Sequence, residues 1–591
     1  MKNVKLLCLG LLIAGSANAQ YFQHLYGSTR SEHLESGVNA VITAPQGHIM
    51  TGYTDVPGIN SLMVTSTDLN GNIPGGFNNW YRITEPNQPA LDVKGRRVVQ
   101  FASNRIGVWG DYAYGAGNLS TRFFYTLLAP TGAPGVTVSF QLPFPVAEVH
   151  ATSMCVSRST ATANNVYVCG WERQTAGGIR VPVIMCLNWA TGAIVWSWQY
   201  NVANISAGTD WVPEDLVESP YPNSTGSTDI ALTGSFVQPS GFLTGCFFTV
   251  DAFTGVNSSP IVTYGSPNAT QSFNAIDIAN NPFGSGPGFV MAGTSNFAGG
   301  DDSWAMKINP NGLIVNFSTL QDYNPSDRNY GYDIIERRNT SGRFEYYVGG
   351  YVNNGRFGQN DDVVFKLDAA GWPVVSGQFT YGGPGNEQAF QLDQYNGYGV
   401  QNDGLSVFGN TDGGSWPMIG GPDFYLVKAY FNGVDSPTCN WDTISFDSIR
   451  GPGLYETWQP TNPNKLKRVT LTNAAFSMTD WEICRGINPG GSNARMAQTV
   501  EQQILAPGYF PNPVSLDNPV INVTFGNVVT QGEAEIELWN SLGQLVWTKK
   551  STLTDGQTQM QVDLGDQLSG GIYQLVIRQN GTINNYRIVV K

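Results

Sequence analysis

Short segments of alternating apolar residues, each ending in glycine, recur through the first three quarters of the chain. Alternation of this kind predicts β-strands. The segments, such as HIMTGY and FVMAGT, follow one another at intervals of 56 to 64 residues, which predicts a repeated structural module. The seven glycines that end them are Gly52, Gly110, Gly170, Gly234, Gly293, Gly349 and Gly409.

Each glycine is followed by a second apolar segment, a tight turn and a third segment, and a further strand precedes it. In the stretch from Ser303 to Gly312, the pair Asn311-Gly312 can supply the positive φ that a hairpin turn needs. The strand before this unit's glycine is Phe273 to Asn280. Four strands in each of seven units predict an all-β fold, a seven-bladed β-propeller over residues 20–433.

The stretch from Tyr21 to Gly27 is similar to the outer strands of the later units. An outer strand follows each of the first six units, whereas the seventh, which ends with Phe424 to Gly433, has no obvious one. We therefore expect Tyr21 to Gly27 to pair with the last blade and close the ring, which would remove two exposed sheet edges. The alternative is an ordered arm outside the ring.

The N-terminal residues have the pattern of a secretory signal peptide. Lys2 and Lys5 precede an apolar run from Leu6 to Ala14 and a small-residue cleavage pattern that ends at Ala19. The run is too short to remain in a bilayer as a spanning helix. We expect residues 1–19 to be removed and the remaining chain to be soluble and exported.

Composition limits the classes of partner. The chain has 69 glycines, 33 prolines and 12% aromatic residues, which favours strands joined by many turns. Its formal net charge of -14 argues against nucleic acid or an anionic lipid surface as a partner. An evenly spread acidic surface is more typical of solubility than of recognition.

Two turn sequences are similar to those of known propeller families. The stretch WATGAIVW (Trp189 to Trp196) resembles the repeat of pyrroloquinoline-quinone-type propellers. The stretch from Asp302 to Gly312 resembles repeats of secreted Bacteroidota propellers. The resemblance supports the fold and implies no quinone, because the turn itself explains the shared residues. No cofactor is expected.

From residue 508 the chain again alternates apolar and polar residues, with turns at Ser541-Leu542-Gly543 and Asn580-Gly581, which predicts a small β-sandwich over residues 508–591. This tail closely resembles the C-terminal sorting domain of Bacteroidota type IX secretion substrates. The resemblance implies export through the type IX secretion machinery, followed by release or by attachment to surface lipopolysaccharide. The residues that carry it are Pro511, Asn512, Pro513, Leu542, Gly543, Gln544, Gly571, Ile572 and Tyr573.

Between the two lies a turn-rich stretch, residues 434–489, which we expect to be a small separate module. Cys439 and Cys484 stand near its ends and, in an oxidising compartment, are expected to form a disulfide. Residues 490–507 are expected to be a linker. The tripeptides that contain Thr443 and Ser448 resemble the O-glycosylation acceptor of Bacteroidota, and tripeptides this short also arise by chance.

Most kinds of catalytic site are unsupported by the sequence. The chain has four histidines and contains no HExxH, GxSxG or Walker motif. The cysteines lack the spacing of zinc ligands. Cys155 and Cys169 fall on neighbouring predicted strands and could form a disulfide across a hairpin, while Cys186 and Cys246 are expected to be core residues.

One set of carboxylates is a candidate metal-binding or catalytic site. Asp277, Asp333 and Asp393 each lie sixteen residues before their unit's glycine, on the strand expected to line the central channel. A ring of them could hold Ca²⁺ or act as acid and base. The alternative, which we favour, is that a recurrent aspartate fixes the local backbone through N–H groups.

The sequence favours a secreted or cell-surface propeller that acts as a binding or adhesion protein, with an extracellular glycan or protein as its ligand. Many aromatic residues, including Trp109, Trp211, Trp372 and Trp416, fall at predicted loops and blade edges, where stacking needs no reactive group. Two alternatives stay open. One is an extracellular polysaccharide lyase or hydrolase, and the other is a structural component of an extracellular layer or filament.

Overall fold

The structure is a computed structural model of the chain. It describes residues 22–27, 30–40, 47–56, 59–69, 71–73, 77–84, 92–101, 103–114, 120–141, 147–200, 210–222, 227–237, 241–259, 261–265, 269–280, 288–296, 301–322, 328–338, 343–353, 359–382, 385–396, 403–412, 422–430, 441–443, 446–447, 465–468, 470–475, 479–485, 508–510, 519–524, 532–540, 544–553, 559–564, 568–579 and 582–590. The chain divides into two compact units, residues 1–491 and 492–591.

The first unit contains seven antiparallel sheets, numbered here as blades 1 to 7. Blade 1 contains β2 (Glu32–Ala40), β3 (Gly47–Val56), β4 (Ile59–Asp68) and β5 (Asn78–Thr84). Blade 2 contains β6 (Val93–Gln100), β7 (Ile106–Tyr114), β8 (Ser120–Leu128) and β9 (Pro134–Gln141). Blade 3 contains β10 (Glu148–Val156), β11 (Asn165–Arg173), β12 (Arg180–Asn188) and β13 (Ile194–Gln199), with a short 3-10 helix, η2 (Thr160–Thr162), between β10 and β11. Blade 4 contains β14 (Trp211–Pro222), β15 (Thr228–Val237), β16 (Leu243–Asp251) and β17 (Val262–Tyr264).

The other three blades repeat this order. Blade 5 contains β18 (Gln271–Ala279), β19 (Gly288–Ser295), β20 (Asp302–Ile308) and β21 (Ile314–Asp322). Blade 6 contains β22 (Asn329–Arg338), β23 (Phe344–Asn353), β24 (Asn360–Leu367) and β25 (Pro373–Tyr381). Blade 7 contains β26 (Glu387–Asn396), β27 (Asp403–Thr411), β28 (Asp423–Tyr430) and β1 (Phe22–Gly27).

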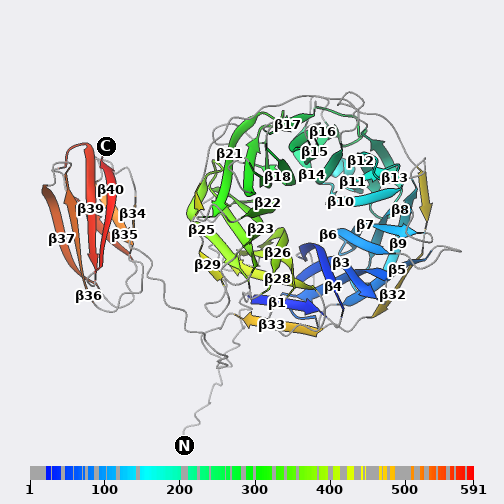
Figure 1. The fold of residues 1–591 in the computed structure, drawn as a ribbon, viewed down its shortest axis with the longest axis horizontal. Helices are drawn as coiled ribbons and strands as arrows, with labels where there is room; N and C mark the ends of the chain where they lie inside the picture. The colour runs from blue at the N-terminus through cyan, green and yellow to red at the C-terminus, as the bar shows by residue number, and fades with distance from the viewer. Residues whose placement is uncertain are drawn as a thin grey trace, which may run out of the picture. The chain divides into compact units, whose positions relative to one another are not determined.

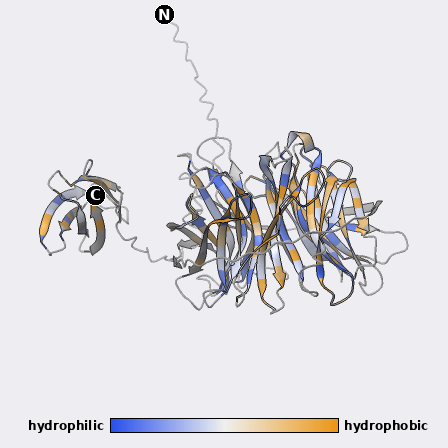
Figure 2. Ribbon diagram, turned by 90° about the horizontal axis from the view of Figure 1, so that it is seen from above, coloured by the Kyte–Doolittle hydropathy of each residue, from blue (hydrophilic) through white to orange (hydrophobic). Residues whose placement is uncertain are grey.

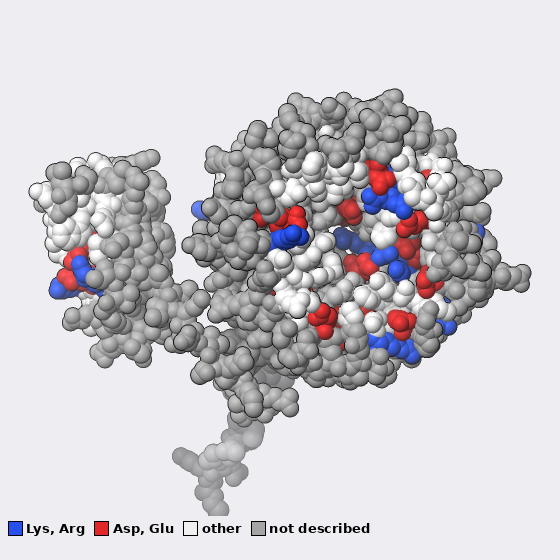
Figure 3. All heavy atoms as spheres, in the orientation of Figure 1, with Lys and Arg blue, Asp and Glu red and all other residues white. Residues whose placement is uncertain are grey.

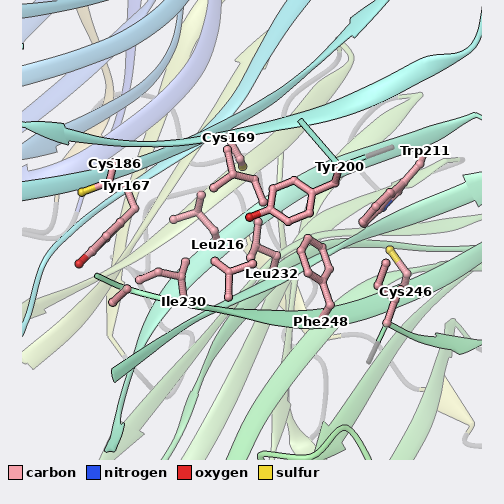
Figure 4. Packing of buried hydrophobic residues seen from close by; sticks show 14 of the residues in the cluster. Tyr167, Cys169, Cys186, Tyr200, Trp211, Leu216, Ile230, Leu232, Cys246 and Phe248 are labelled. Atoms are coloured by element: carbon pink, nitrogen blue, oxygen red, sulfur yellow. The ribbon is translucent and has the colours of Figure 1, made fainter. Parts of the chain in front are cut away.

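The seven sheets stand around a common centre, with the first strand of each blade innermost (Figure 1). Apolar segments lie within the strands of the ring (Figure 2). They pack between neighbouring blades, as in the cluster of Tyr167, Trp211 and Phe248 between blades 3 and 4 (Figure 4). The chain is therefore an all-β protein whose first unit is a seven-bladed β-propeller, as the sequence predicts.

The ring is closed by β1, which pairs antiparallel with β28 of blade 7. This is the pairing expected from the sequence for Tyr21 to Gly27. Leu25 lies in the apolar cluster between blades 6 and 7, and Tyr26 lies in the cluster between blades 7 and 1. The Tyr26 hydroxyl donates a hydrogen bond of 2.6 Å to the carbonyl of Gly71 in blade 1. The first described strand therefore contributes to both faces of the last blade.

The described strands within residues 434–489 do not form the separate module that the sequence suggested. They are fifth strands on the outer edges of the propeller, and we call them the belt: β29 (Trp441–Thr443), β30 (Phe446–Asp447), β31 (Lys465–Arg468), β32 (Thr470–Ala475) and β33 (Thr479–Arg485). They pair antiparallel with β25, β21, β9, β5 and β1 in turn. Along the chain, the belt strands therefore join blades 6, 5, 2, 1 and 7 in that order. This is the reverse of the order in which the blades follow one another around the ring.

The physical reason for this correction lies in the sheet edges. Each outer strand leaves a row of backbone N–H and C=O groups unpaired, and an added strand satisfies them. In blade 7, β1 then lies between β28 and β33 and is paired on both sides. Within the described ranges, no fifth strand pairs with β13 or β17.

The C-terminal unit contains two antiparallel sheets. One has the order β34 (Gly508–Phe510), β35 (Val520–Thr524), β38 (Gln559–Asp563), and the other β37 (Leu545–Leu553), β36 (Gly532–Trp539), β39 (Gly571–Gln579), β40 (Thr582–Val590). Gly571 begins β39, and Tyr573 is buried in the unit's core with its hydroxyl donating to the Ser569 carbonyl. The other predicted motif residues, Pro511, Asn512, Pro513 and Gly543, lie outside the described residues.

The expected Cys155–Cys169 disulfide is wrong, because both cysteines are free. Between the β10 bulge and the β10–β11 hairpin the register is continuous, and in it Cys155 lies opposite Tyr167 and Cys169 lies opposite Ser153. Residues on such a diagonal are about 7–8 Å apart, beyond the reach of a disulfide. The Cys169 sulfur instead contacts the Thr152 hydroxyl at 3.3 Å.

The structure describes only some of the other residues for which the sequence predicts a disulfide, a core position or a modification. Cys186 and Cys246 are buried core residues, as the sequence predicts (Figure 4). Cys439 and Ser448 lie outside the described residues, as do residues 1–19 and 490–507. Cys484 and Thr443 are described only through their backbone pairing with Gln23 and Phe379. The Cys439–Cys484 disulfide and the two glycosylation sites therefore stay predictions.

Candidate functional site

Every inner strand contains a β-bulge at an equivalent position, where one residue is skipped in the pairing with the second strand. Just before the bulge the inner strand lies very close to the repeat glycine of its partner. A Cβ added to Gly52 would lie 1.8 Å from the His33 carbonyl oxygen, and one added to Gly293 would lie 1.8 Å from that of Ser272. The close backbone approach at the bulge therefore accounts for the glycine that marks each unit of the sequence.

In blade 6 the glycine at this position is Gly350, not Gly349. Gly350 pairs with Gly331 just before the bulge, and an added Cβ would lie 1.6 Å from the Tyr330 carbonyl oxygen. Because Gly349 and Gly350 are consecutive, the sequence pattern placed the repeat glycine of blade 6 one residue too early. Counted from the bulge residue, Asp333 comes directly after it, whereas Asp277 and Asp393 lie two positions further along their strands.

The skipped residues face the central channel. Each is partly exposed, whereas the flanking positions, apart from Arg97, are buried. From blade 1 to blade 7 these bulge residues are Glu35, Arg96, Thr152, Glu214, Asn274, Tyr332 and Phe390. We call the end of the channel at which the seven inner strands begin the channel mouth. Figure 3 shows acidic and basic side chains gathered around the hollow at the centre of the ring.

Beyond the bulges, aspartates of the inner strands join neighbouring blades. The carboxylates of Asp215, Asp277, Asp333 and Asp393 each accept a hydrogen bond from the backbone of the next blade. The donating N–H groups are those of Ile276 (3.0 Å to Asp215), Glu336 (2.9 Å to Asp277), Leu392 (2.7 Å to Asp333) and Asn39 (2.6 Å to Asp393). The recurrent aspartates do bind backbone N–H groups, but these include the adjacent blade's inner strand rather than only a local turn.

The electrostatics of these aspartates do not resemble those of a cation site. Burial raises the pKa of Asp333 to about 8 and that of Asp393 to about 6, and the charge of Arg97 opposes both shifts. Arg97 also lies 3.7 Å from Asp215. In the described part of the chain, no group of three or more His, Cys, Asp or Glu side chains is placed to hold a metal ion. Ca²⁺ binding stays a prediction.

At the channel mouth, Arg96 connects blades 1, 2 and 3. Its guanidinium donates to Glu35 at 2.6 Å, to Asp111 at 2.9 Å and to Nδ1 of His150 at 3.2 Å. Because a guanidinium can only donate, Nδ1 of His150 must accept, which places the proton of the neutral ring on Nε2. Burial, followed by the charge of Arg96, lowers the pKa of His150 to about 4. The histidine is therefore neutral at physiological pH.

Beside this network, a group of side chains on blade 3 surrounds the Trp171 indole. The His150 ring stacks on it with centroids 5.4 Å apart. The guanidinium carbons of Arg173 and Arg180 lie 5.5 Å and 5.6 Å from its centroid, within the range of cation–π attraction. Both arginine side chains keep about a quarter of their surface exposed.

Blades 6 and 7 contribute an aromatic cluster at the mouth, which we call the tyrosine sector: Tyr330, Tyr332, Tyr351 and Phe390. Tyr351 stacks on Tyr330 at 4.7 Å and on Tyr332 at 5.7 Å, and Tyr332 meets Phe390 edge-on at 5.5 Å. All four rings are partly exposed. Rings held in mutual contact at a surface offer a rigid stacking platform.

The sequence had singled out other aromatic residues. Trp109 and Trp211 are fully buried between blades, and Trp372 is partly exposed in the turn between β24 and β25. Trp416 lies outside the described residues. The mouth residues were missed because their direction depends on the bulge. The only local signal was the repeat glycine, whose distance from the bulge residue varies from blade to blade.

Residues 509–591 match the family of secretion system C-terminal sorting domains. The sorting domain indicates type IX secretion to the cell surface or extracellular space, as the sequence motifs predict. The chain is thus an exported β-propeller protein. None of the curated proteins matches its sequence. Among the described residues, no helix is long and apolar enough to span a membrane.

Solved structures with some similarity share little of the sequence. The hemagglutinin-neuraminidase ectodomain of parainfluenza virus 5 is 7% identical, with 59% of this chain and 82% of that chain covered and a TM-score of 0.29. PorZ, a surface component of the type IX secretion system of Porphyromonas gingivalis, is 9% identical, with 94% and 81% covered and a TM-score of 0.22. At these scores the assignment of the propeller rests on its strand pairing.

Proposed function

We propose that the exported propeller is a binding or adhesion protein, and that an extracellular glycan binds at the channel mouth over the tyrosine sector. The observation that supports this is the set of four mutually packed, partly exposed rings on the inner strands and second strands of blades 6 and 7. Sugar rings bind to such faces through stacking and burial of apolar area, with no reactive group required.

The position of these rings distinguishes them from ordinary core aromatics. The large rings between blades, such as Trp109 and Tyr125, are fully buried and serve packing. Tyr330 and Tyr332 instead lie at alternate positions of β22 and are both partly exposed. Their hydroxyl groups add polar contacts at the edge of the stacking surface, as in Tyr330, which donates to Asp301 at 3.1 Å.

The test is a glycan array followed by calorimetric titration with the full chain. Tyr351→Ala removes the ring that contacts both Tyr330 and Tyr332, and we expect affinity to fall about tenfold, since an aromatic anchor contributes on the order of 1–2 kcal/mol. Trp189→Ala is the matched control. Trp189 is also stacked and partly exposed, against Phe101, but lies at the opposite end of the strands.

Three results would contradict the proposal. Equal loss of affinity in both variants would point to a general effect on the fold. Binding of extracellular proteins without any glycan would assign a protein ligand. Release of shortened products from a bound polysaccharide would favour the lyase or hydrolase alternative.

A further inference from the structure

Two arginines lie directly opposite each other in blade 3. In the pairing of β11 with β12, Arg173 is the partner of Arg180, and in the pairing of β10 with β11, Glu148 is the partner of Arg173. Directly paired residues of an antiparallel ladder point to the same face of the sheet. Like charges in that arrangement repel, so the pair weakens the ladder unless anions lie near the guanidinium groups.

The acids already present leave donors of both guanidinium groups unused. Arg173 bonds to Glu148 through Nη1 at 2.8 Å, and its Nε is buried without a hydrogen-bond partner. Arg180 bonds to Asp210 through Nε at 2.9 Å, which leaves its two terminal nitrogens for another acceptor. The Trp171 ring beneath the two groups limits the directions in which they can move.

Two ionisable groups near the arginines, Glu214 and His150, add little negative charge at neutral pH. Burial raises the pKa of Glu214 to about 8, although Arg180 acts in the opposite direction, so this carboxyl group is mostly protonated and can donate a hydrogen bond. His150 is neutral, as described above. Among the described residues, the carboxylates bonded directly to the pair are those of Glu148 and Asp210.

We propose that Arg173 and Arg180, held over Trp171, form a subsite for an acidic sugar, with one carboxylate or sulfate group bridging the two guanidinium groups. Planar, multi-donor recognition of oxyanions is the interaction to which paired arginines are suited. The inference rests on the proposed glycan-binding function and specifies the ligand's charge. A glycan of this class would place its anionic group on blade 3 and its uncharged rings towards the tyrosine sector.

The experiment measures affinity of the full chain for three probes: a uronate oligosaccharide, a sulfated oligosaccharide and a neutral oligosaccharide. The variant is Arg173→Gln with Arg180→Gln. The control is Arg82→Gln, because Arg82 also lies over a tryptophan, Trp80, at 4.9 Å but on the outer strand of blade 1. We expect wild type to prefer at least one acidic probe, and the double variant to bind that probe at least tenfold more weakly with unchanged affinity for the neutral one.

Two further readouts keep the result interpretable. Affinity for the acidic probe should fall as salt is raised, whereas affinity for the neutral probe should not. Arg180→Lys keeps the charge but loses the fork of donors, so it should bind with intermediate affinity if the fold is intact. The stronger of the uronate and sulfate responses identifies the anionic group.

The subsite is refuted if the double variant binds acidic probes as wild type does, or if wild type binds only the neutral probe. In the second case Tyr351→Ala would still weaken binding and the proposed function would stand. If wild type binds none of the three probes, and no other glycan, both the subsite and the proposed function are refuted.

Discussion

Closure of the ring by β1 can be tested through Leu25. This side chain is 1% exposed and packs in the cluster between blades 6 and 7, together with Tyr425 and Val427 of β28. Replacing it with alanine removes buried methyl groups and leaves a cavity, because β1 is paired on both sides and cannot move inwards easily. A substitution of this kind costs about 3 kcal/mol of unfolding free energy.

The shift in melting temperature follows from the size of the cooperative unit. If the propeller unfolds as one unit of about 400 residues, its unfolding entropy is about 0.8 kcal/mol/K, so 3 kcal/mol lowers Tm by about 4 °C. The control is Val195→Ala on β13, another outer strand, where the side chain is 52% exposed. We expect that control to stay within about 0.5 kcal/mol of wild type.

Scanning calorimetry of the full chain at a fixed heating rate measures both variants. The core of the C-terminal unit shares no residue with the propeller clusters. Its unfolding transition is therefore an internal reference, whose melting temperature neither substitution should change. An unchanged propeller transition in Leu25→Ala, equal to that of Val195→Ala, would show that β1 is not part of the closed ring in solution.

Four shorter predictions test other parts of the molecule. Gly350→Ala should prevent folding of blade 6, because its Cβ would meet a backbone carbonyl, and circular dichroism would show the loss. Burial and Glu32 raise the pKa of Asp423 to about 8, so its contribution to stability is complete below about pH 4 and is lost progressively as pH rises from about 4 to about 8; Asp423→Asn should flatten this fall in Tm. EDTA should leave Tm unchanged if the channel aspartates bind only backbone N–H groups. Removal of residues 508–591 should leave the protein in the periplasm, as fractionation of a type IX host would reveal.

The number and order of the propeller strands could be predicted because the signals are local. Alternation with a period of two marks each strand, and glycines with positive φ, such as Gly71, Gly192 and Gly312, mark the turns. The closing strand was predictable from an imbalance in the count of outer strands. None of these inferences required knowledge of which residues meet across the ring.

The errors arose where the outcome depends on non-local pairing. The belt adds strands through backbone hydrogen bonds, which leave no residue pattern that distinguishes an added edge strand from a small module. The Cys155–Cys169 pairing failed because the register set by the β10–β11 hairpin places each cysteine opposite a residue two positions away from the other cysteine. The mouth residues were missed because a bulge decides which side chain of β6 or β22 turns towards the channel.

The bulge also explains how one inner strand can serve both stability and recognition. Beyond it, side chains such as Asp277 and Asp333 bond to the next blade's backbone, so their identity is fixed by the ring geometry. At the bulge the extra residue has no partner on the second strand and faces the channel, so its identity can differ from blade to blade: a carboxylate in Glu35, a guanidinium in Arg96 and an aromatic ring in Phe390. Chemical diversity is therefore concentrated at the mouth, where a ligand can contact several blades at once, and the regularity of the repeat is preserved elsewhere.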